Sequence, residues 1–561
     1  MFNKFAKLLI IIIITYQNPG YSKSASFNEF NSRDLSNYFS GIIAFENNDN
    51  IDALKYFNSS KILLNKHDPY LKRYVYSLVL EDKVANAINI VKNNSNKKNS
   101  DFFEAYILLI INSLKKNDFL EAEKYLSKIE KFNEYGRFNT VITEILKNFI
   151  HTFNKKKIFN NSINFGNISI ISQAFQRCYL SKNTTRSSFL NLINNPNGDY
   201  SRYIFFYANY LIENKEIEEV NEIYQGIKFI NSPLLLSQSK SWVEKKEYKN
   251  FTKIFSCSNH SDIVSEFLFL VSNLYSSEGE LVKSNFYSNL SNYLNPKFRF
   301  NLALIAENYY SNNQYDKLKK VLKNFEKKNE YYFWFRIKKE AQILIKEKGE
   351  DFGMNFISSK FNQIEKPSFK ILFDIANFYK NSKNYKKAIE HYSEIILNLD
   401  QASEMKSDLL YRRGSSYERL KNYKKSDEDL LNSMKINPND AYVLNYLAYS
   451  WLERDYKIDE AMKMLKKAYA MENNDPYIID SIGWAYYLID NYLEAEKYLK
   501  RAIELMPDDP VVNDHYGDIL WKLNRKLQAR YFWNNVLSFD DADEEIKEKI
   551  NLKLIEGLTN S

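Results

Sequence analysis

The sequence predicts an all-α fold, a superhelical solenoid built from stacked helix pairs. Within residues 476–510, apolar side chains recur at helical spacing in two bursts, 477–488 and 492–505, separated by a short polar turn. This two-helix pattern returns about every 34 residues. The chain has 561 residues, far more than one ordinary core organises, and only 13 Gly and 10 Pro. A solenoid fits that length, since each unit packs only on its neighbours.

The first and second helices of each pair carry small residues at fixed places. Gly483 and Ala495 would let two backbones approach, and Ala502 would do the same toward the next helix. Asp475 is placed to cap the first helix, with Pro476 at its first position. The equivalent marker positions in neighbouring units are Gly414 with Ser426, Ala448 with Ala461, and Gly517 with Ala529.

The same register continues toward the N-terminus in more degenerate form. The markers are Ala376 with Ala388, Ala341 with Gly353, Ala306 with Leu318, Ser272 with Ser284, Ala122, Ala87, and Gly41 with Ala53. Small residues at these places, with large ones between them, resemble the tetratricopeptide repeat (TPR) family. The resemblance implies a right-handed superhelix whose first helices line a concave groove for peptide or protein partners.

Residues 1–24 have the pattern of a signal peptide. Lys4 and Lys7 precede an unbroken apolar run at 8–14, and small residues precede Ala25. The run is too short to span a bilayer, so no transmembrane span is expected in the mature chain. No Cys follows it, which argues against a lipoprotein. We expect an exported protein that is periplasmic or envelope-associated; an uncleaved N-terminus is the alternative.

The rest of the chain divides by how well it keeps the repeat phase. We expect degenerate helix pairs at residues 25–131 and an irregular helical segment at 132–200. Further degenerate repeats should follow at 201–367, a well-formed array at 368–540, and a capping helix with a tail at 541–561.

The net charge and the spacing of the two cysteines argue against several functions. The formal net charge of +8 is small for the length, and both signs are interspersed, so we expect no nucleic-acid partner. Cys178 and Cys257 lack metal-ligand spacing. Two unpaired buried thiols are expected, with a disulfide between them as the alternative.

No catalytic constellation stands out. The five His do not pair at metal-binding spacing, and neither a phosphate-binding glycine loop nor a nucleophile elbow is present. We therefore expect no enzyme, no cofactor and no metal. An enzyme with a site between turns of the superhelix remains an alternative, which a pocket of convergent titratable residues would support.

The candidate binding residues lie on the first helices of the C-terminal units. Residues three or four apart share a helix face, and rings beside amides and carboxylates suit an extended or helical peptide. The predicted groove residues are Tyr442, Asn445, Tyr449, Tyr477, Asp480, Trp484, Tyr487, Asp514, Asp518 and Trp521, preceded by Tyr411 and Ser415. Only Asn445 resembles the set by which chaperone-binding family members hold a C-terminal carboxylate.

The last two repeats, 479–510 and 511–537, resemble those of large proteobacterial envelope TPR proteins. Some members of that group are adaptors that bring substrates to a periplasmic processing protease. The resemblance implies an interaction scaffold or adaptor. An assembly factor for secretion, pilus or cell-wall machinery is the alternative.

Overall fold

The computed structural model describes residues 32–558 apart from 66, 96–97, 160–162, 197, 228–231, 400–403 and 540–541. These residues form α-helices joined by turns, with no β-strand among them, which confirms the predicted all-α fold. They fall into two compact units, an N-terminal unit ending at Ile343 and a C-terminal unit beginning at Leu344. The predicted signal peptide lies outside the described residues.

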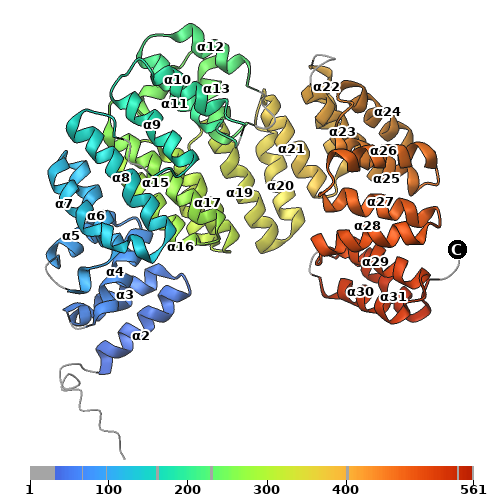
Figure 1. The fold of residues 1–561 in the computed structure, drawn as a ribbon, viewed down its shortest axis with the longest axis horizontal. Helices are drawn as coiled ribbons and strands as arrows, with labels where there is room; N and C mark the ends of the chain where they lie inside the picture. Colours follow the sequence, from blue (N-terminus) through green and yellow to red (C-terminus); the bar gives the residue numbers. More distant parts are fainter. Residues whose placement is uncertain are drawn as a thin grey trace, which may run out of the picture. The chain divides into compact units, whose positions relative to one another are not determined.

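In both units the helices follow one another in sequence order, packed pair on pair (Figure 1). Within the described part of the chain, no helix combines the length and the apolar character needed to cross a membrane.

The N-terminal unit contains helices α2 to α18 and most of α19. Their bounds are α2 (Ser32–Glu46), α3 (Asn50–Ser59), α4 (Asp68–Leu80), α5 (Val84–Asn93), α6 (Phe103–Lys115), α7 (Phe119–Ile129), α8 (Arg137–Lys155), α9 (Asn167–Tyr179), α10 (Thr185–Ile193), α11 (Arg202–Glu213), α12 (Ile217–Gln225), α13 (Leu234–Glu244), α14 (Lys249–Ile254), α15 (His260–Ser277), α16 (Leu281–Leu294), α17 (Leu302–Ser311), α18 (Tyr315–Leu322) and α19 (Glu330–Lys348).

Residues 132–200, predicted to hold irregular helices, contain three regular ones, α8, α9 and α10. Helix α8 is a single helix of 19 residues. It carries no small residue at a marker position. Because α8 is one long helix rather than two short ones, its sequence does not show the two-helix pattern of the 34-residue repeat. Helices α9 and α10 pack against each other, and α8 packs between α7 and α9.

The N-terminal unit folds back on itself, because α15 and α16 pack against α4, α6 and α8. The rings of Tyr76 and Phe286 lie 4.6 Å apart, and Asn289 donates from Nδ2 to the carbonyl oxygen of Val79 at 2.9 Å. Every residue of α6 from Ile107 to Leu114 is buried. A helix buried on all sides offers no binding face, so α6 is core rather than the wall of a groove.

A disulfide joins Cys178 on α9 to Cys257, which follows α14, across 79 residues. The expectation of two unpaired thiols is therefore wrong. The sequence suggested it because the two residues lie in different units of the repeat. The fold brings their Cα atoms to 5.5 Å, within the usual range for a disulfide.

The C-terminal unit begins with a single helix, continues as five helix pairs and ends with one further helix. These are α20 (Glu350–Phe361); the pairs α21 (Phe369–Asn381) with α22 (Tyr385–Leu397), α23 (Glu404–Arg419) with α24 (Tyr423–Ile436), α25 (Ala441–Leu452) with α26 (Ile458–Met471), α27 (Pro476–Leu488) with α28 (Tyr492–Leu505), and α29 (Pro510–Lys522) with α30 (Lys526–Ser538); and α31 (Glu544–Glu556).

In three of these pairs, a glycine on the first helix lies under a bulky side chain 16 residues later, while α21 and α25 carry a buried alanine at the equivalent position. A Cβ on Gly483 would lie 2.8 Å from Cγ of Leu499, and one on Gly414 would lie 3.0 Å from Cγ of Leu430. Gly517 meets the Trp533 ring in the same way. The alanine markers are fully buried at Ala448, Ala461, Ala495, Ala502 and Ala529. Small residues thus stand where two helices approach most closely.

Replacing Gly483 by Ala should destabilise the C-terminal unit. The new methyl group would meet Leu499 Cγ and its backbone nitrogen, so the helices must separate, at a cost of about 1–3 kcal/mol. Denaturant unfolding followed by tryptophan fluorescence would measure the loss. Gly226→Ala is the control, because its methyl group would meet nothing closer than 3.5 Å. Equal stability of the two variants would contradict the close helix approach.

Candidate functional site

The first helices of successive pairs in the C-terminal unit contact one another, α23 with α25, α25 with α27, and α27 with α29. Because the repeat step is 34 or 35 residues, equivalent positions form columns across these helices. One column holds Tyr442, Tyr477 and Val511; a second holds Asn445, Asp480 and Asp514; a third holds Tyr449, Trp484 and Asp518; and a fourth includes Tyr487 and Trp521. We call this surface the first-helix face.

The first column is open to solvent. Tyr442, Tyr477 and Val511 are 53%, 57% and 44% exposed. The hydroxyl of Tyr442 donates to Asp475 at 3.3 Å, and Asp475 also caps α27 through the backbone N–H groups of Tyr477 and Ile478. The aromatic side chains are therefore positioned by neighbouring helix ends, while their rings remain free.

Asn445 and Tyr449, on the same helix as Tyr442, have side-chain polar atoms without a hydrogen-bond partner among the described residues. The side-chain carbonyl oxygen of Asn445 is buried and accepts no hydrogen bond from any described residue. Burial, with Glu453 and Asp480 nearby, raises the pKa of Tyr449 well above its usual value, so its hydroxyl stays protonated at neutral pH. Tyr442, Asn445 and Tyr449 share one face of α25, and Tyr477 stands at the position of Tyr442 on α27; we call these four residues the tyrosine patch.

Trp484 is held between two rings. Its ring stacks on Tyr487 at 4.5 Å and on His515 at 4.0 Å, and its Nε1 donates to Glu453 at 2.7 Å. The indole is partly exposed, so it borders the tyrosine patch as a rigid wall.

Asp480 does not face solvent. It is 6% exposed, and its Oδ2 lies 2.9 Å from Nδ1 of His515, which is equally buried. Burial alone would lower the pKa of His515, but the Asp480 carboxylate raises it above its usual value. The sequence analysis gave His515 no role. The signal was its spacing, since His515 lies next to Asp514, which is one repeat step of 34 residues after Asp480.

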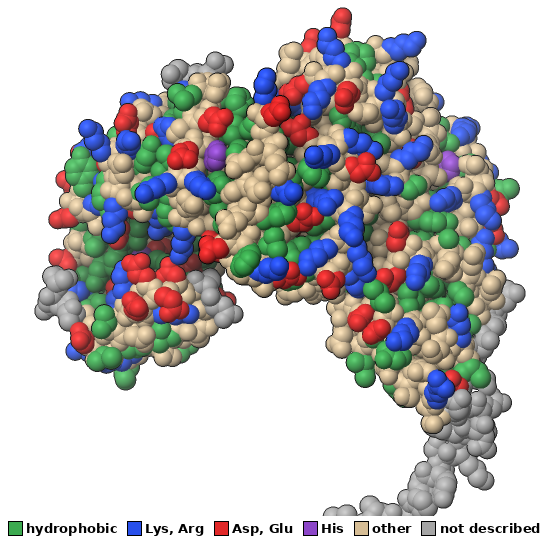
Figure 2. Space-filling view, turned by 180° about the vertical axis from the view of Figure 1, so that it is seen from behind, with side chains coloured by type: hydrophobic (Ala, Val, Ile, Leu, Met, Phe, Trp, Pro, Cys, Tyr) green, Lys and Arg blue, Asp and Glu red, His purple; other side chains and the backbone are tan. Residues whose placement is uncertain are grey.

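The capping helix neutralises the other two predicted carboxylates. Nζ of Lys553 on α31 contacts Asp514 and lies 2.8 Å from Oδ1 of Asp518, which also accepts from Nε1 of Trp533 at 3.0 Å. Burial and the neighbouring Asp514 raise the pKa of Asp518 to about 6. Figure 2 shows acidic side chains gathered over the last helices of this unit. Asp518 is therefore a buried partner of the cap rather than an open binding group.

Trp521 is covered by the end of the described chain. A Cβ on Gly557 would overlap the Trp521 ring, and Trp533 packs 5.3 Å from it. Lys526 and Arg530 each lie 5.1 Å from the ring centre. Among the earlier first-helix residues, Ser415 is buried and donates to a carbonyl of its own helix, and Tyr411 packs against Tyr446. These residues hold the stack together.

The N-terminal unit contains a half-open cavity of about 210 Å³. Its lining includes Glu81, Asp82, Lys317 and Lys320. Nζ of Lys317 already donates to the carbonyl oxygen of Asn48 at 2.7 Å and faces Glu81 at 3.8 Å. The described residues include no group of three His, Cys, Asp or Glu that could hold a metal ion. This arrangement ties helix ends together and places no nucleophile beside a base.

Comparison with known proteins identifies the repeats. The tetratricopeptide repeat family profile matches residues 369–397, 407–440 and 478–509. These segments cover α21–α22, α23–α24 and α27–α28. The C-terminal unit therefore carries TPR repeats, as the 34-residue register predicts, and repeats of this kind mediate protein–protein interaction.

Two curated relatives share part of the chain. A TPR repeat-containing protein of Pseudomonas aeruginosa is 32% identical over 89 residues, covering 16% of this chain and 15% of that protein. One from Methanocaldococcus jannaschii is 32% identical over 112 residues, covering 20% and 17%. The matched segments thus span less than a fifth of either relative. A TPR protein of Thermus thermophilus matches 34% of this chain and all of its own at 16% identity, with a TM-score of 0.30.

The last repeats should lose stability as the pH rises. The folded-state pKa values of Asp518 and His515 both lie above their ordinary values, so the folded unit holds protons that the unfolded chain releases earlier. Their contribution is present at low pH and is lost as pH rises, through about 6 for Asp518 and above 6.5 for His515. Amide hydrogen exchange in α29 and α31, corrected for intrinsic rates, would measure it.

The control for this pH dependence is Asp518→Asn, which removes the carboxyl titration and should leave only the His515 step. Protection of α29 that stays constant or increases between pH 5 and 8 in the unaltered protein would contradict the assignment.

Proposed function

We propose that this protein is a non-catalytic interaction scaffold of the bacterial cell envelope that binds an extended segment of a partner protein along the tyrosine patch. The observation that carries the proposal is the exposure of Tyr442 and Tyr477 at equivalent positions of successive first helices. Contiguous exposed apolar surface is typical of interaction sites, and these two rings lie on the face that successive first helices share.

The chemistry of the patch favours a peptide. Tyrosine rings supply contact area at low entropic cost, and an amide can pair with the main chain of an extended ligand. Tyr449 offers a hydroxyl, and Asn445 has an unpaired carbonyl oxygen that is buried in the unbound chain and would pair once its side chain turns toward the ligand. Rings spaced one repeat apart would contact side chains along the ligand, while the polar atoms between them would bind its backbone.

Two observations support export. The apolar run at residues 8–14 follows two lysines, as in a signal peptide. The disulfide between Cys178 and Cys257 belongs with an oxidising compartment, because the cytosol keeps thiols reduced. The proposal places the protein in the periplasm or at the envelope.

Within the envelope, an adaptor for a processing protease is the specific role we propose, on the resemblance of residues 479–537 to envelope TPR proteins. An assembly factor for secretion, pilus or cell-wall machinery would use the same patch. The identity of a crosslinked partner separates the two.

Site-specific photo-crosslinking tests the patch. A photoreactive residue at Tyr477 should give a discrete adduct in intact cells, because a ligand on the patch would lie against that side chain. The same residue at Lys500, exposed on the second helix α28, is the matched control. Mass spectrometry of the adduct would identify the partner and the contacted segment. Equal adducts from both positions, or none from Tyr477, would remove the patch from the proposal.

Thiol labelling tests the compartment. In the full chain isolated from cells, Cys178 and Cys257 should resist alkylation until a reductant is added. In a chain that begins at Ala25 and stays in the cytosol, both should label at once under denaturing conditions. Free thiols in the full chain would argue against export.

A further inference from the structure

The last three helix pairs keep positive charge away from their first helices. Up to Trp521, α25, α27 and α29 contain no lysine or arginine. The carboxylates of these helices are their three N-cap residues and three residues within them, which are Asp440, Asp475, Asp509, Asp480, Asp514 and Asp518. The second helices α26 and α28 instead carry exposed cations, at Lys463, Lys466, Lys467, Lys497, Lys500 and Arg501. The formal net charge of the protein is +8, so an acidic face departs locally from its overall sign.

The aspartates within the helices already have cations. Asp480 is paired with His515, whose Nδ1 lies 2.9 Å from its Oδ2. Asp514 and Asp518 both contact the ammonium of Lys553. These three carboxylates are therefore compensated, and any uncompensated negative charge of the first helices lies at their N-caps.

Asp475 is the N-cap that contacts the tyrosine patch. Its Oδ2 accepts from the Tyr442 hydroxyl at 3.3 Å, and its Oδ1 accepts from the backbone N–H groups of Tyr477 and Ile478 at 3.0 and 3.1 Å. Its donors are thus all uncharged, and it makes no ion pair with a described residue. An ionised carboxylate has about four acceptor positions, so about one remains on this partly exposed side chain.

The other two caps differ from Asp475. Asp440 follows Pro438 by two residues, and the carbonyl oxygen of Pro438 accepts from the Lys467 ammonium at 2.8 Å, so a cation already reaches that loop. Asp509 precedes Val511, which has no ring. Of the three caps, Asp475 alone contacts tyrosines of two helices.

The rings beside Asp475 favour a cation. Tyr442 and Tyr477 are 53% and 57% exposed, so a ligand can cover their faces. An ammonium or guanidinium is attracted to the electron-rich face of a tyrosine ring. Asp475 raises the pKa of Tyr442 above its usual value, and Glu472 and Asp440 act in the same direction, so three carboxylates lie near this hydroxyl. A cation lying on Tyr442 would therefore meet a ring and a carboxylate together.

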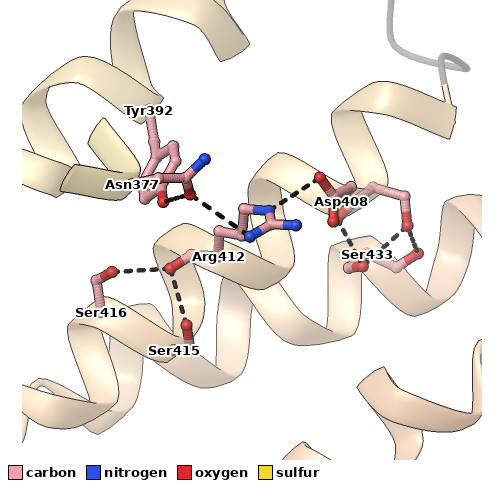
Figure 3. Close-up of polar contacts among 8 residues, drawn as sticks. Asn377, Tyr392, Asp408, Arg412, Ser415, Ser416 and Ser433 are labelled. Atoms are coloured by element: carbon pink, nitrogen blue, oxygen red, sulfur yellow. Dashed lines mark hydrogen bonds and ion pairs between the residues drawn. The ribbon is translucent and has the colours of Figure 1, made fainter. Parts of the chain in front are cut away.

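The acidic face begins after α23. Asp408 stands one repeat step before Tyr442, and Arg412, one turn further along α23, donates from Nε to its Oδ2 at 3.0 Å. Figure 3 shows the Arg412 guanidinium lying between Asp408 and Asn377 of α21, whose Oδ1 it reaches at 3.4 Å. The residue at the Arg412 position of α25 is Tyr446. The tyrosine patch therefore starts where the first helices replace an arginine by a ring.

We propose that the partner segment is basic where it lies on the tyrosine patch, with a lysine or arginine side chain that covers the exposed rings and pairs with Asp475. The inference rests on the proposed function and adds the chemistry of the partner. An acidic segment would bring its charge against Asp475, Glu472 and Asp440. An apolar segment would cover Asp475 and leave its charge unpaired, which costs free energy. A cation complements both the rings and the carboxylate.

The test uses the full chain and two labelled peptides of equal length, acetylated and amidated at their ends. One alternates alanine with lysine and the other alternates alanine with glutamate. Fluorescence anisotropy should show the lysine peptide binding at least about fivefold more tightly at low salt, as one ion pair and one cation–π contact permit, with the preference shrinking as salt is added. The overall charge of +8 predicts the opposite order, because non-specific attraction would favour glutamate. A lysine preference therefore reports a local site.

Asp475→Asn should lower the affinity for the lysine peptide by about two- to fivefold, the range of one exposed ion pair. The substitution keeps the helix cap, because Asn caps a helix as well as Asp does. Asp118→Asn is the matched control and should retain the affinity. Asp118 caps α7 in the N-terminal unit by the same kind of bond, from the backbone N–H of Glu121 at 3.0 Å. Thermal midpoints close to that of the unaltered protein would show that both variants fold.

Equal affinity for the two peptides, tighter binding of the glutamate peptide, or an unchanged lysine preference in Asp475→Asn would overturn the basic partner. The adduct formed from Tyr477 separates this failure from failure of the proposed function. An adduct whose contacted segment lacks lysine and arginine would overturn the inference and leave the tyrosine patch as a binding surface. No adduct from Tyr477 would overturn both.

Discussion

The stack depends on the close approach of two helices at a residue that has no side chain. In each case a glycine on the first helix lies under a large side chain 16 residues later. Gly483 lies under Leu499 and Gly517 under Trp533, and Gly41 near the start of the described chain lies under Phe57. The same 16-residue offset therefore occurs in both units. It sets how closely the two helices of a pair approach, and the step of 34 or 35 residues places equivalent residues on successive first helices.

That alignment explains why the candidate site is made of columns. In the first column, Tyr442 and Tyr477 are exposed to solvent. In the second column, Asp480 is buried and is paired with His515 of the next first helix. A single substitution in one column changes the surface of only its own repeat and the next one. A repeat protein can therefore alter its ligand chemistry locally while the glycine contacts maintain the backbone.

The repeat register was predictable because small residues and apolar bursts recur locally. Contacts between distant repeats were not. The Cys178–Cys257 disulfide and the packing of α15 and α16 across α4 and α6 depend on how the N-terminal unit closes, which no local period encodes. Within the site, the aromatic positions were predictable from spacing. The burial of Asp480 and Asp518 was not, because their partners, His515 and Lys553, lie on other helices.

Both units pair most of their buried polar groups and leave a few without a partner among the described residues, such as Asn209 Oδ1 in the N-terminal unit and Asn445 Oδ1 in the C-terminal unit. In the N-terminal unit, the buried Arg202 is bonded to Glu266 and Asn301, so a charge inside the fold is fully paired. In the C-terminal unit, the Asn445 carbonyl oxygen has no partner among the described residues, and Asn445 shares a helix face with the exposed Tyr442. Folding alone would favour apolar replacements at such positions. What distinguishes Asn445 from the unpaired groups of the N-terminal unit is its place beside the exposed Tyr442, so that a ligand lying on that ring would cover it and could pair with its amide.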